Sequence, residues 1–537
     1  MTERWGMIID LNRCVGCQTC TAACKHYNDT TPGVQWRRVL DVEHGTFPDV
    51  QRLFLVVGCQ HCANPPCVPV CPTGATRQRA DGLVTMDYDQ CLGCASCVVA
   101  CPYQARTIAQ ENRWYYGTET AQEQHVLHED RLGVAQKCTF CIDKIDDAKA
   151  ANKTPGVDFD VTPACAASCI ASAIHFGDFN DPQSNVSRIA RDNQTFQMHE
   201  ELGTDPQIRY LYEAPAIPGR DTDAAARGAV DETAPLAGER QTFWDFRAAM
   251  NFIAGGFGTG LAIAAYVLFL LSHLSDAMLT YLYAASAVVV AIGLFFVFLK
   301  IGRKLRFARV ILRPQSSWMT REVYCAGVFF PAVLADLIWR LDVLHLIVAL
   351  GAAGFLYCQA RILVASKGIP AWRAAPIQGM LMATALYEGA ALLGLAVAVF
   401  PGQVPFTVWL SAAGVALAGV NAMLWRRYRN AADAEGLGAA ARRALARITP
   451  WLHGFGHALP AALFLGAAPS DQPAVWLGLA GIAALAGGAG WKFTVVVLAS
   501  YQQGYAVPRL PQRGSGTRAA PTRSHGPQPV AYQIPTT

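Results

Sequence analysis

The hydrophobic positions divide this chain into two unlike parts. From residue 1 to about residue 240, apolar and polar residues are mixed and apolar runs are short. From about 250 to 500, Ala, Leu, Val, Gly and Phe dominate in long runs. Short runs bounded by Gly and Pro predict small strands and tight turns, here at 7–10, 53–58 and 83–87. Runs near 20 residues long instead predict helices that cross a membrane.

Eight apolar segments approach the length of about 20 residues that spans a bilayer. A soluble helical bundle is the alternative, but segments this long and this poor in charge disfavour it. Segments seven and eight are the weakest, because they contain Pro450, Pro460 and many small residues. The segments are 250–272, 278–299, 320–340, 343–364, 376–399, 405–425, 448–468 and 473–499.

Charge sets the expected orientation of these segments. Charged residues make up only 16% of the chain, against about 25% in an ordinary soluble protein. The net charge of +4 is too small to indicate a nucleic-acid partner. Lys and Arg concentrate in the connections after segments two, four and six and in the C-terminal tail, which all lie on one side if there are eight spans. The positive-inside rule then puts both termini and the polar N-terminal part in the cytoplasm, beside the inner membrane.

The first ten residues contain neither a long apolar core nor a twin-arginine pair. We therefore expect no N-terminal export signal.

Cysteines give the polar part its chemistry. Sixteen of the eighteen cysteines fall into four groups of four. Groups one and three have the spacing C-x2-C-x2-C-x3-C, which holds cubane clusters in bacterial ferredoxins, and the other two groups read as the same motif with a loop inserted. The groups are Cys14, Cys17, Cys20, Cys24; Cys59, Cys62, Cys67, Cys71; Cys91, Cys94, Cys97, Cys101; and Cys138, Cys141, Cys165, Cys169.

Disulfides and zinc are the alternatives for so many cysteines. Disulfides need an oxidising compartment, which the absence of an export signal disfavours. Zinc sites pair two C-x2-C hooks across a longer loop, whereas groups one to three contain triple-cysteine runs, and groups two and three end in Cys-Pro. Sixteen thiolates are the number that four [4Fe–4S] clusters require. We therefore expect iron–sulfur clusters, and we expect the clusters to hold together a domain with little core of its own.

Six motifs around the cysteines carry a family resemblance. They are Ile9-Asp10-Leu11-Asn12-Arg13-Cys14-Val15-Gly16-Cys17, Trp36-Arg37-Arg38-Val39, Cys59-Gln60-His61-Cys62, Cys101-Pro102-Tyr103, Lys137-Cys138-Thr139-Phe140-Cys141 and Phe176-Gly177-Asp178-Phe179-Asn180-Asp181-Pro182. This set resembles the iron–sulfur subunit of dimethyl-sulfoxide-reductase-type molybdoenzyme complexes over about residues 5 to 215. In the nitrate-reductase branch of that family a Trp replaces the second cysteine of group three. Cys94 is present here, so the resemblance implies four [4Fe–4S] clusters.

The resemblance also implies how the groups share ligands. Each cluster takes three cysteines from one group and a fourth from its paired group. The implied sets are Cys14, Cys17, Cys20 with Cys169; Cys138, Cys141, Cys165 with Cys24; Cys59, Cys62, Cys67 with Cys101; and Cys91, Cys94, Cys97 with Cys71. Ile170 departs from the family, which usually has Pro after the last cysteine.

A second resemblance covers about residues 243 to 500. The stretch Ser317-Trp318-Met319-Thr320-Arg321-Glu322 resembles the S-W-x-x-R-E signature of the membrane-anchor subunit of the same complexes, and Ala254-Gly255-Gly256-Phe257 is a weaker match. This resemblance implies eight helices, no haem and a site that oxidises or reduces a quinone. The family commonly has His-Leu-Gly where this chain has Lys300-Ile301-Gly302, so a histidine proposed to bind quinol is missing.

Residue chemistry at the start of the third segment agrees with a quinone site. A quinone head group needs hydrogen-bond donors and a proton carrier at the membrane edge. Glu322 is the expected proton carrier, and Lys300, Arg321 and Trp318 are the expected donors, with Asn251 as a further contact. The alternative is an interfacial ion pair beside an anchoring Trp.

Other polar residues lie within the apolar segments, where such residues are usually functional or paired. A haem held by His345 and His453 is conceivable, but hydrogen bonds between helices are the favoured role, and no haem is expected. These residues are Asp336, His345, Glu388, His453, His457 and Lys492.

The chain is therefore expected to have four regions. An α+β ferredoxin-like four-cluster domain covers 1–212, and a linker or extended docking arm covers 213–242. An all-α membrane bundle of about eight transmembrane helices with the quinone site covers 243–500, and a disordered tail covers 501–537.

The sequence shows no dinucleotide fingerprint, no P-loop and no molybdopterin-sized domain. We expect an electron-transfer and membrane-anchor subunit that relays electrons between a separate molybdopterin-containing catalytic subunit and the quinone pool. The alternatives are a stand-alone ferredoxin:quinone oxidoreductase and a redox-coupled ion pump.

Overall fold

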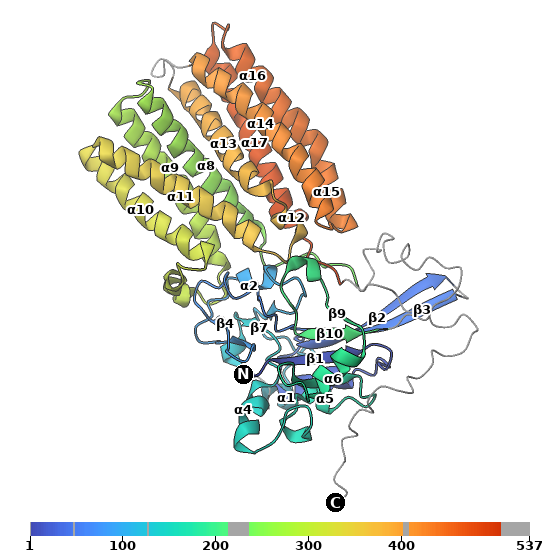
Figure 1. Cartoon of the computed structure of the whole chain (residues 1–537). Coiled ribbons are helices and arrows are strands. Elements are labelled where there is room, and N and C mark those ends of the chain that lie inside the picture. The colour runs from blue at the N-terminus through green and yellow to red at the C-terminus, as the bar shows by residue number, and fades with distance from the viewer. Residues whose placement is uncertain (1, 47–48, 126–127, 213–235, 401–406, 506–537) are drawn as a thin grey trace, which may run out of the picture.

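The computed structural model describes residues 2–46, 49–125, 128–212, 236–400 and 407–505. They form a cysteine-rich domain and a helical bundle that stands on it (Figure 1). The expected linker 213–242 and tail 501–537 lie mostly outside the described residues.

A four-stranded sheet joins the two ends of the cysteine-rich domain. Its strand order is β8-β1-β10-β9, formed by Ile174–Asp178, Trp5–Asp10, Ile208–Leu211 and Thr195–Phe196. β1 pairs in parallel with β10, with Met7 opposite Ile208, and antiparallel with β8. Every residue of β1 is buried, which agrees with the strand expected at 7–10.

The rest of this domain consists of short elements between cysteine loops. Three two-stranded sheets are β2 (Arg37–Thr46) with β3 (Asp49–Gly58), β4 (Thr76–Gln78) with β5 (Val84–Met86), and β6 (Thr107–Ile108) with β7 (Ala135–Gln136). The helices are α1 (Thr19–Tyr27), α2 (Ser96–Val99), α3 (Ala121–His125), α4 (Ile142–Ala150), α5 (Ala164–Ala167) and α6 (Asn185–Asp192), with single 3-10 turns at η1 (Glu129–Arg131), η2 (Phe159–Val161) and η3 (Glu200–Leu202). The strands expected at 53–58 and 83–87 are present in β3 and β5, so the α+β ferredoxin-like class is confirmed.

Within the described residues, seven helical runs are long and apolar enough to cross a membrane. They are α8 (Phe246–Leu270), α9 (Asp276–Lys300), α10 (Trp318–Trp339), α11 (Asp342–Ala365), α13 (Ile377–Val399), α14 (Thr407–Ala434) and the run Pro473–Leu498, in which α17 (Pro473–Phe493) continues into the π-helical η6 (Thr494–Leu498). These seven correspond to seven of the eight expected segments.

The expected segment 448–468 is built differently. It lies in a helical run made of α15 (Ala439–Trp451), a π-helical turn η5 (Leu452–Ala458) and α16 (Leu459–Ala467). Pro450 and Pro460 each lack a backbone N–H, and a π-helical turn is one way to accommodate the interrupted hydrogen-bond ladder. The run still crosses the bundle beside α14 and α17, but it is not among the seven candidate spans (Figure 1).

The basic connections between helices lie against the cysteine-rich domain. The α9–α10 connection contains η4 (Lys304–Leu312), and the Arg303 N–H donates to the Leu92 carbonyl at 3.0 Å. The α11–α13 connection contains α12 (Pro370–Arg373), and Gly368 lies against the backbone of Cys101. The first residues of the expected tail are ordered here, since Tyr505 is buried and its hydroxyl accepts a hydrogen bond from Arg38 at 2.8 Å.

Candidate functional site

The four cysteine groups share one backbone turn. In each group the residue before the second cysteine has a positive φ, with values of 71° at Gly16, 42° at His61, 77° at Gly93 and 60° at Phe140. This left-handed conformation bends the chain so that two thiols of a group face the same space. Gly16 and Gly93 adopt it readily, whereas His61 and Phe140 adopt it at a cost, which their ring stacking at 3.8 Å helps to offset. The sequence showed the cysteine spacing but not that His61 and Phe140 occupy glycine-like positions.

The structure brings the sixteen thiols together as four sets, each drawn from two groups. Four thiols, those of Cys14, Cys17, Cys20 and Cys169, line one cavity. In the other three sets, Cys24, Cys62 and Cys97 each interact electrostatically with the three remaining thiols of their own set. We call them set 1 (Cys14, Cys17, Cys20, Cys169), set 2 (Cys24, Cys138, Cys141, Cys165), set 3 (Cys59, Cys62, Cys67, Cys101) and set 4 (Cys71, Cys91, Cys94, Cys97). This grouping is the one that the family resemblance implies.

The buried thiols are better explained as ligands of iron than as core residues without a metal. All eighteen cysteines of the chain are free of disulfides. Burial raises the pKa of the Cys91 and Cys138 thiols to about 11 and that of Cys20 to about 12. Packing four such thiols together without a cation leaves them protonated, whereas iron holds them as thiolates. The donor set and spacing therefore fit four [4Fe–4S] clusters.

Two fully buried arginines lie between successive sets. The Arg106 guanidinium donates from Nη2 to the Cys67 Sγ of set 3 at 3.2 Å. It also donates from Nη1 to the Thr76 hydroxyl at 3.1 Å, and the Thr76 N–H donates to the Cys71 Sγ of set 4 at 3.5 Å. Arg106 therefore touches set 3 directly and set 4 through Thr76.

Arg37 occupies the corresponding place between sets 1 and 2. The thiols that interact most strongly with its charge are Cys165, Cys138, Cys24 and Cys20, and they raise the pKa of its guanidinium above the usual value. Its Nε and Nη1 have no hydrogen-bond partner among the described residues. Because a buried charge without a counter-charge costs several kcal/mol, roughly, an anionic group at sets 1 and 2 is what this arginine requires.

Sets 2 and 3 are separated by His61 and Lys137. The Val84 N–H donates to Nδ1 of His61 at 3.1 Å, so the other ring nitrogen carries the proton and donates to the Cys138 carbonyl at 3.1 Å. Burial lowers the pKa of His61 well below its usual value, which keeps the ring neutral. The Lys137 ammonium donates to the same carbonyl at 2.7 Å and to the Val84 carbonyl.

Set 4 meets the helical bundle through Cys94, beside the backbone contact of Cys101 of set 3 with Gly368. Lys300 Nζ and Trp244 Nε1 both donate to the Cys94 carbonyl, each at 3.2 Å. Gly302 follows in the same connection, and a Cβ there would lie 2.2 Å from the Gly133 carbonyl, so only glycine permits this contact between the halves. Figure 1 places α2, which contains Cys97, beside the bundle, and α1 and α5, which contain ligands of sets 1 and 2, at the distant end of the domain.

The five residues expected at the quinone site fall into three neighbouring groups. Glu322 is buried inside the bundle, where Asn251 Nδ2 donates to its carboxylate at 3.4 Å, and Gln359 donates to the Asn251 carbonyl at 2.9 Å. Lys300 belongs to the contact with Cys94, and its ammonium lies 4.5 Å from the centre of the Trp244 ring.

Arg321 and Trp318 form the third group. The Arg321 guanidinium lies 4.2 Å from the centre of the Trp318 ring and donates to the carbonyls of Pro314 and Gln315 at 2.7 and 2.8 Å. It therefore holds the loop before α10 in place. It forms no ion pair with Glu322 or with another described residue, so the interfacial ion pair weighed as the alternative is absent from the described residues, and Arg321 stacks on Trp318 instead.

A small cavity lies between Trp318 and the part of the cysteine-rich domain that holds set 4. Its lining includes Ser96, Trp244, Trp318 and Ser366. The Ser96 hydroxyl lies 3.3 Å from Cys94 Sγ, so the cavity reaches a residue that contacts a ligand of set 4. Sequence reasoning missed Trp244 and Gln359, because neither lies in a motif and both are recognised only by what they contact.

Four of the other six polar residues of the bundle are paired with one another. Lys492 donates to the Glu388 carboxylate at 2.6 Å, with both side chains buried. Asp336 accepts from the Thr280 hydroxyl at 2.8 Å and lies 3.1 Å from His345 Nε2. His453 and His457 lie together in η5.

Comparison with family models finds two matches in the cysteine-rich domain. A 4Fe-4S binding domain matches residues 5–26, and a 4Fe-4S dicluster domain matches residues 50–123. Both descriptions agree with the chemistry of the thiol sets.

Curated relatives match about two fifths of the chain, a share equal in size to the cysteine-rich domain. The B subunit of the selenate reductase of Mesobacillus selenatarsenatis is 38% identical over 39% of this chain and 72% of its own length. The iron-sulfur B subunit of a putative dimethyl sulfoxide reductase of Halobacterium salinarum is 37% identical over 42% of this chain and 89% of its own length. The iron-sulfur cluster-binding subunit of the menaquinone reductase of Nitratidesulfovibrio vulgaris is 35% identical over 39% of this chain and 88% of its own length.

Proposed function

The N-terminal part of this chain belongs to the family of 4Fe-4S iron–sulfur subunits of dimethyl-sulfoxide-reductase-type enzymes, and from that premise we propose the function of the whole. We propose that the chain fuses this electron-transfer subunit to a membrane anchor. In this proposal it relays electrons between a separate molybdopterin-containing catalytic subunit and the quinone pool.

The contact of Lys300 with Cys94 carries this proposal. Its hydrogen bond of 3.2 Å joins set 4 to the membrane edge of the bundle, beside the bond that Trp244 donates to the same carbonyl. The Cys94 carbonyl belongs to a residue proposed to bind a cluster, and Lys300 ends a candidate membrane span. Sets 4, 3, 2 and 1 then follow one another away from the bundle, which is the arrangement that an electron relay requires.

The chain's own residues have distinct tasks in such a relay. When bound, the clusters supply one-electron transfer. Arg106 and Arg37 place fixed positive charge between sets 3 and 4 and between sets 1 and 2, which favours the more negative, reduced state of their neighbours. Lys300 and Trp244 lie between set 4 and the bundle and cover this side of the set. Trp244 also stacks on Trp372, with ring centres 5.3 Å apart.

Glu322 is the proposed proton carrier for the quinone. Its burial beside Asn251 and Gln359 supports this role, since an isolated carboxyl in such surroundings exchanges a proton rather than forming an ion pair. Trp318 lines the small cavity, and Lys300 contacts Cys94 of set 4. Arg321 positions the loop and is no longer proposed as a direct donor.

The catalytic subunit is proposed to dock at the end of the domain that lies away from the bundle. Cys17 of set 1 is exposed, and two apolar side chains beside this set are unusually open to solvent, Val15 at 57% and Ile170 at 72%. Apolar side chains exposed beside a redox centre are typical of a protein–protein interface. Ile170 is also the position where this chain departs from the family's usual Pro.

The clustered positive charge of the connections beside the cysteine-rich domain supports a cytoplasmic location for that domain. The seven candidate spans support a multi-pass membrane protein. If the α15–α16 run is counted as an eighth passage, the start of the first helix and the end of the last helix lie on the same side of the membrane.

The two alternative functions, an ion pump and a stand-alone oxidoreductase, differ from the relay in the partners or buried polar residues that they require. An ion pump needs carboxylates and amines in a continuous path, whereas here Glu388 pairs with Lys492 and Asp336 pairs with Thr280 and His345. A stand-alone ferredoxin:quinone oxidoreductase would need no large partner. The pairing favours the relay over the pump.

The decisive experiment is purification of the tagged full chain from its native membranes. We expect a large molybdenum-containing chain to co-purify, with iron and acid-labile sulfide matching four clusters, and the clusters to be reduced by a menaquinol analogue. Iron without a molybdenum partner would favour the stand-alone reductase. In vesicles, we expect protons to be taken up and released on one side, and transmembrane charge movement would favour the pump.

A further inference from the structure

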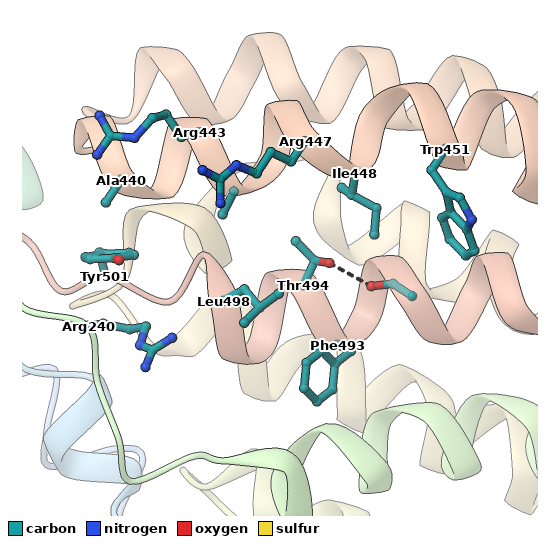
Figure 2. Close-up of a pocket in the computed structure, with 12 residues that line it drawn as sticks. Arg240, Ala440, Arg443, Arg447, Ile448, Trp451, Phe493, Thr494, Leu498 and Tyr501 are labelled. Carbon is teal, nitrogen blue, oxygen red and sulfur yellow. Dashed lines mark hydrogen bonds between the residues drawn. The ribbon is translucent and has the colours of Figure 1, made fainter.

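An open groove lies on the side of the bundle opposite α10. It has a volume of about 700 Å³ and runs between α15 and the continuous run of α17 and η6 (Figure 2). This volume is typical of a ligand site, where about 300 to 1,000 Å³ is usual. The groove is separate from the proposed quinone residues, which lie on α8, α9 and α10.

One end of the groove is strongly basic. Arg240, Arg443 and Arg447 line it together with Tyr501, and the backbones of Arg240 and Tyr501 form an isolated antiparallel bridge. None of the twelve described residues that line the groove is acidic. Within the described part of the chain, Arg240 and Arg447 form no ion pair, so their charges are available to a ligand. α15 begins on the side of the cysteine-rich domain, which places these arginines at a membrane edge.

The other end of the groove is apolar. Ile448, Trp451 and Phe493 line it, and Figure 2 shows them displaced along the helices from Arg240 and Arg443. From Arg443 to Trp451 the helix advances about 12 Å toward the middle of the bilayer. Gly490 forms the floor here, because a Cβ at this position would lie 2.7 Å from the Trp451 ring.

We propose that this groove binds an anionic phospholipid. Its phosphate lies among Arg240, Arg443 and Arg447, and an acyl chain follows Ile448, Trp451 and Phe493. Basic pockets between transmembrane helices at the cytoplasmic surface recognise lipid head groups in this way, and the planar guanidinium matches the geometry of phosphate. A quinone has a neutral head group and gives no reason for three arginines at one end of the groove.

The binding of lipid is tested with the full chain in detergent by native mass spectrometry and thermal unfolding. The probes are phosphatidylglycerol, phosphatidylcholine, inorganic phosphate and a short-chain menaquinone analogue. We expect saturable binding of phosphatidylglycerol with a raised unfolding temperature, and much weaker binding of phosphatidylcholine.

Three variants locate the site. Arg447→Gln and Arg240→Gln should each weaken phosphatidylglycerol binding about fivefold, the effect expected for one cation near an anionic head group. Leu498→Glu places a negative charge at an exposed position of the lining and should weaken binding further. Arg442→Gln is the matched control, because Arg442 lies on the same helix, bonds to Asp433 and is absent from the lining.

The remaining outcomes also decide the question. Equal loss in Arg442→Gln, or equal affinity for phosphatidylcholine, would overturn the proposal. Displacement of the lipid by inorganic phosphate alone would identify a free-phosphate site instead. Displacement by the menaquinone analogue without any preference for anionic lipid would identify a second quinone site.

Discussion

Lys300 donates a hydrogen bond from Nζ to the carbonyl oxygen of Cys94, at a distance of 3.2 Å. The first residue ends a candidate membrane span and the second belongs to the third cysteine group, so this bond crosses the boundary between the two halves of the chain. Gly93, Gly133 and Gly302 make close backbone contacts beside it. The membrane part and thiol set 4 therefore form one continuous structure.

Lys300→Met should slow electron exchange with a quinol analogue by about 10- to 100-fold, because a hydrogen bond from a charged donor contributes about 1.5–3 kcal/mol. Stopped-flow reduction of the clusters measures this rate. Lys304→Met is the control, since Lys304 is exposed in the same connection. An equal loss in both variants would show that general charge in the connection matters and that the contact with Cys94 does not.

Cys94→Ala should remove the cluster nearest the bundle and lower the iron content by up to about four atoms per chain. We expect dithionite still to reduce the other clusters, while reduction by the quinol analogue is lost. Iron analysis and electron paramagnetic resonance spectra measure both effects. Cys325→Ala, outside the four groups, should leave iron unchanged; if it also lowers iron, the assignment of ligands is wrong.

Glu322→Gln should lower quinone-linked turnover by about 10²- to 10⁴-fold, the usual contribution of a general acid or base. The amide keeps the shape and hydrogen bonding of the side chain but carries no exchangeable acidic proton. Cluster content should be unchanged, and turnover with an artificial acceptor should be retained. Asp342→Asn, at an exposed carboxylate on α11, is the control, and an unaffected Glu322→Gln would exclude Glu322 as the proton carrier.

Arg106→Gln should lower the midpoint potentials of the clusters at sets 3 and 4, because it removes a buried positive charge and a hydrogen bond to Cys67. Arg106→Lys keeps the charge and should restore most of the potential. Redox titration followed by electron paramagnetic resonance makes the measurement. Arg77→Gln is the control, since Arg77 is exposed and pairs with Asp87; unchanged potentials in Arg106→Gln would contradict the electrostatic role.

Lys492→Met should destabilise the bundle by about 3–5 kcal/mol, because it leaves the Glu388 carboxylate buried without its partner. The double variant Glu388→Leu with Lys492→Met should recover most of that loss, since buried ion pairs are often replaceable by apolar side chains. Thermal unfolding in detergent gives the comparison. If the double variant is stable but lacks quinone-linked activity, the pair has a functional role, as the ion-pump alternative requires.

The sequence determined the chemistry of the cysteine-rich domain. The regular spacing around Cys14 and Cys91 specifies iron–sulfur ligation because the ligands of one motif lie in a single short loop. Apolar runs specify membrane helices because length and hydrophobicity are properties of one continuous segment. It was less informative at Pro450 and Pro460, where a π-helical turn divides the expected span 448–468 into shorter helices.

Only the tertiary structure decided which residues from distant segments of the chain contact one another. It placed Arg37 among thiols from α1, α5 and the loop at Cys138, and it gave Lys300 a partner in Cys94. It also separated Arg321 from Glu322, although the two are adjacent in the chain, because neighbouring residues of a helix point in different directions. The spacing of residues in the sequence indicates contacts within one loop or on one helix face. Contacts between distant segments, and the burial and charge pairing that they produce, depend on how the whole chain packs.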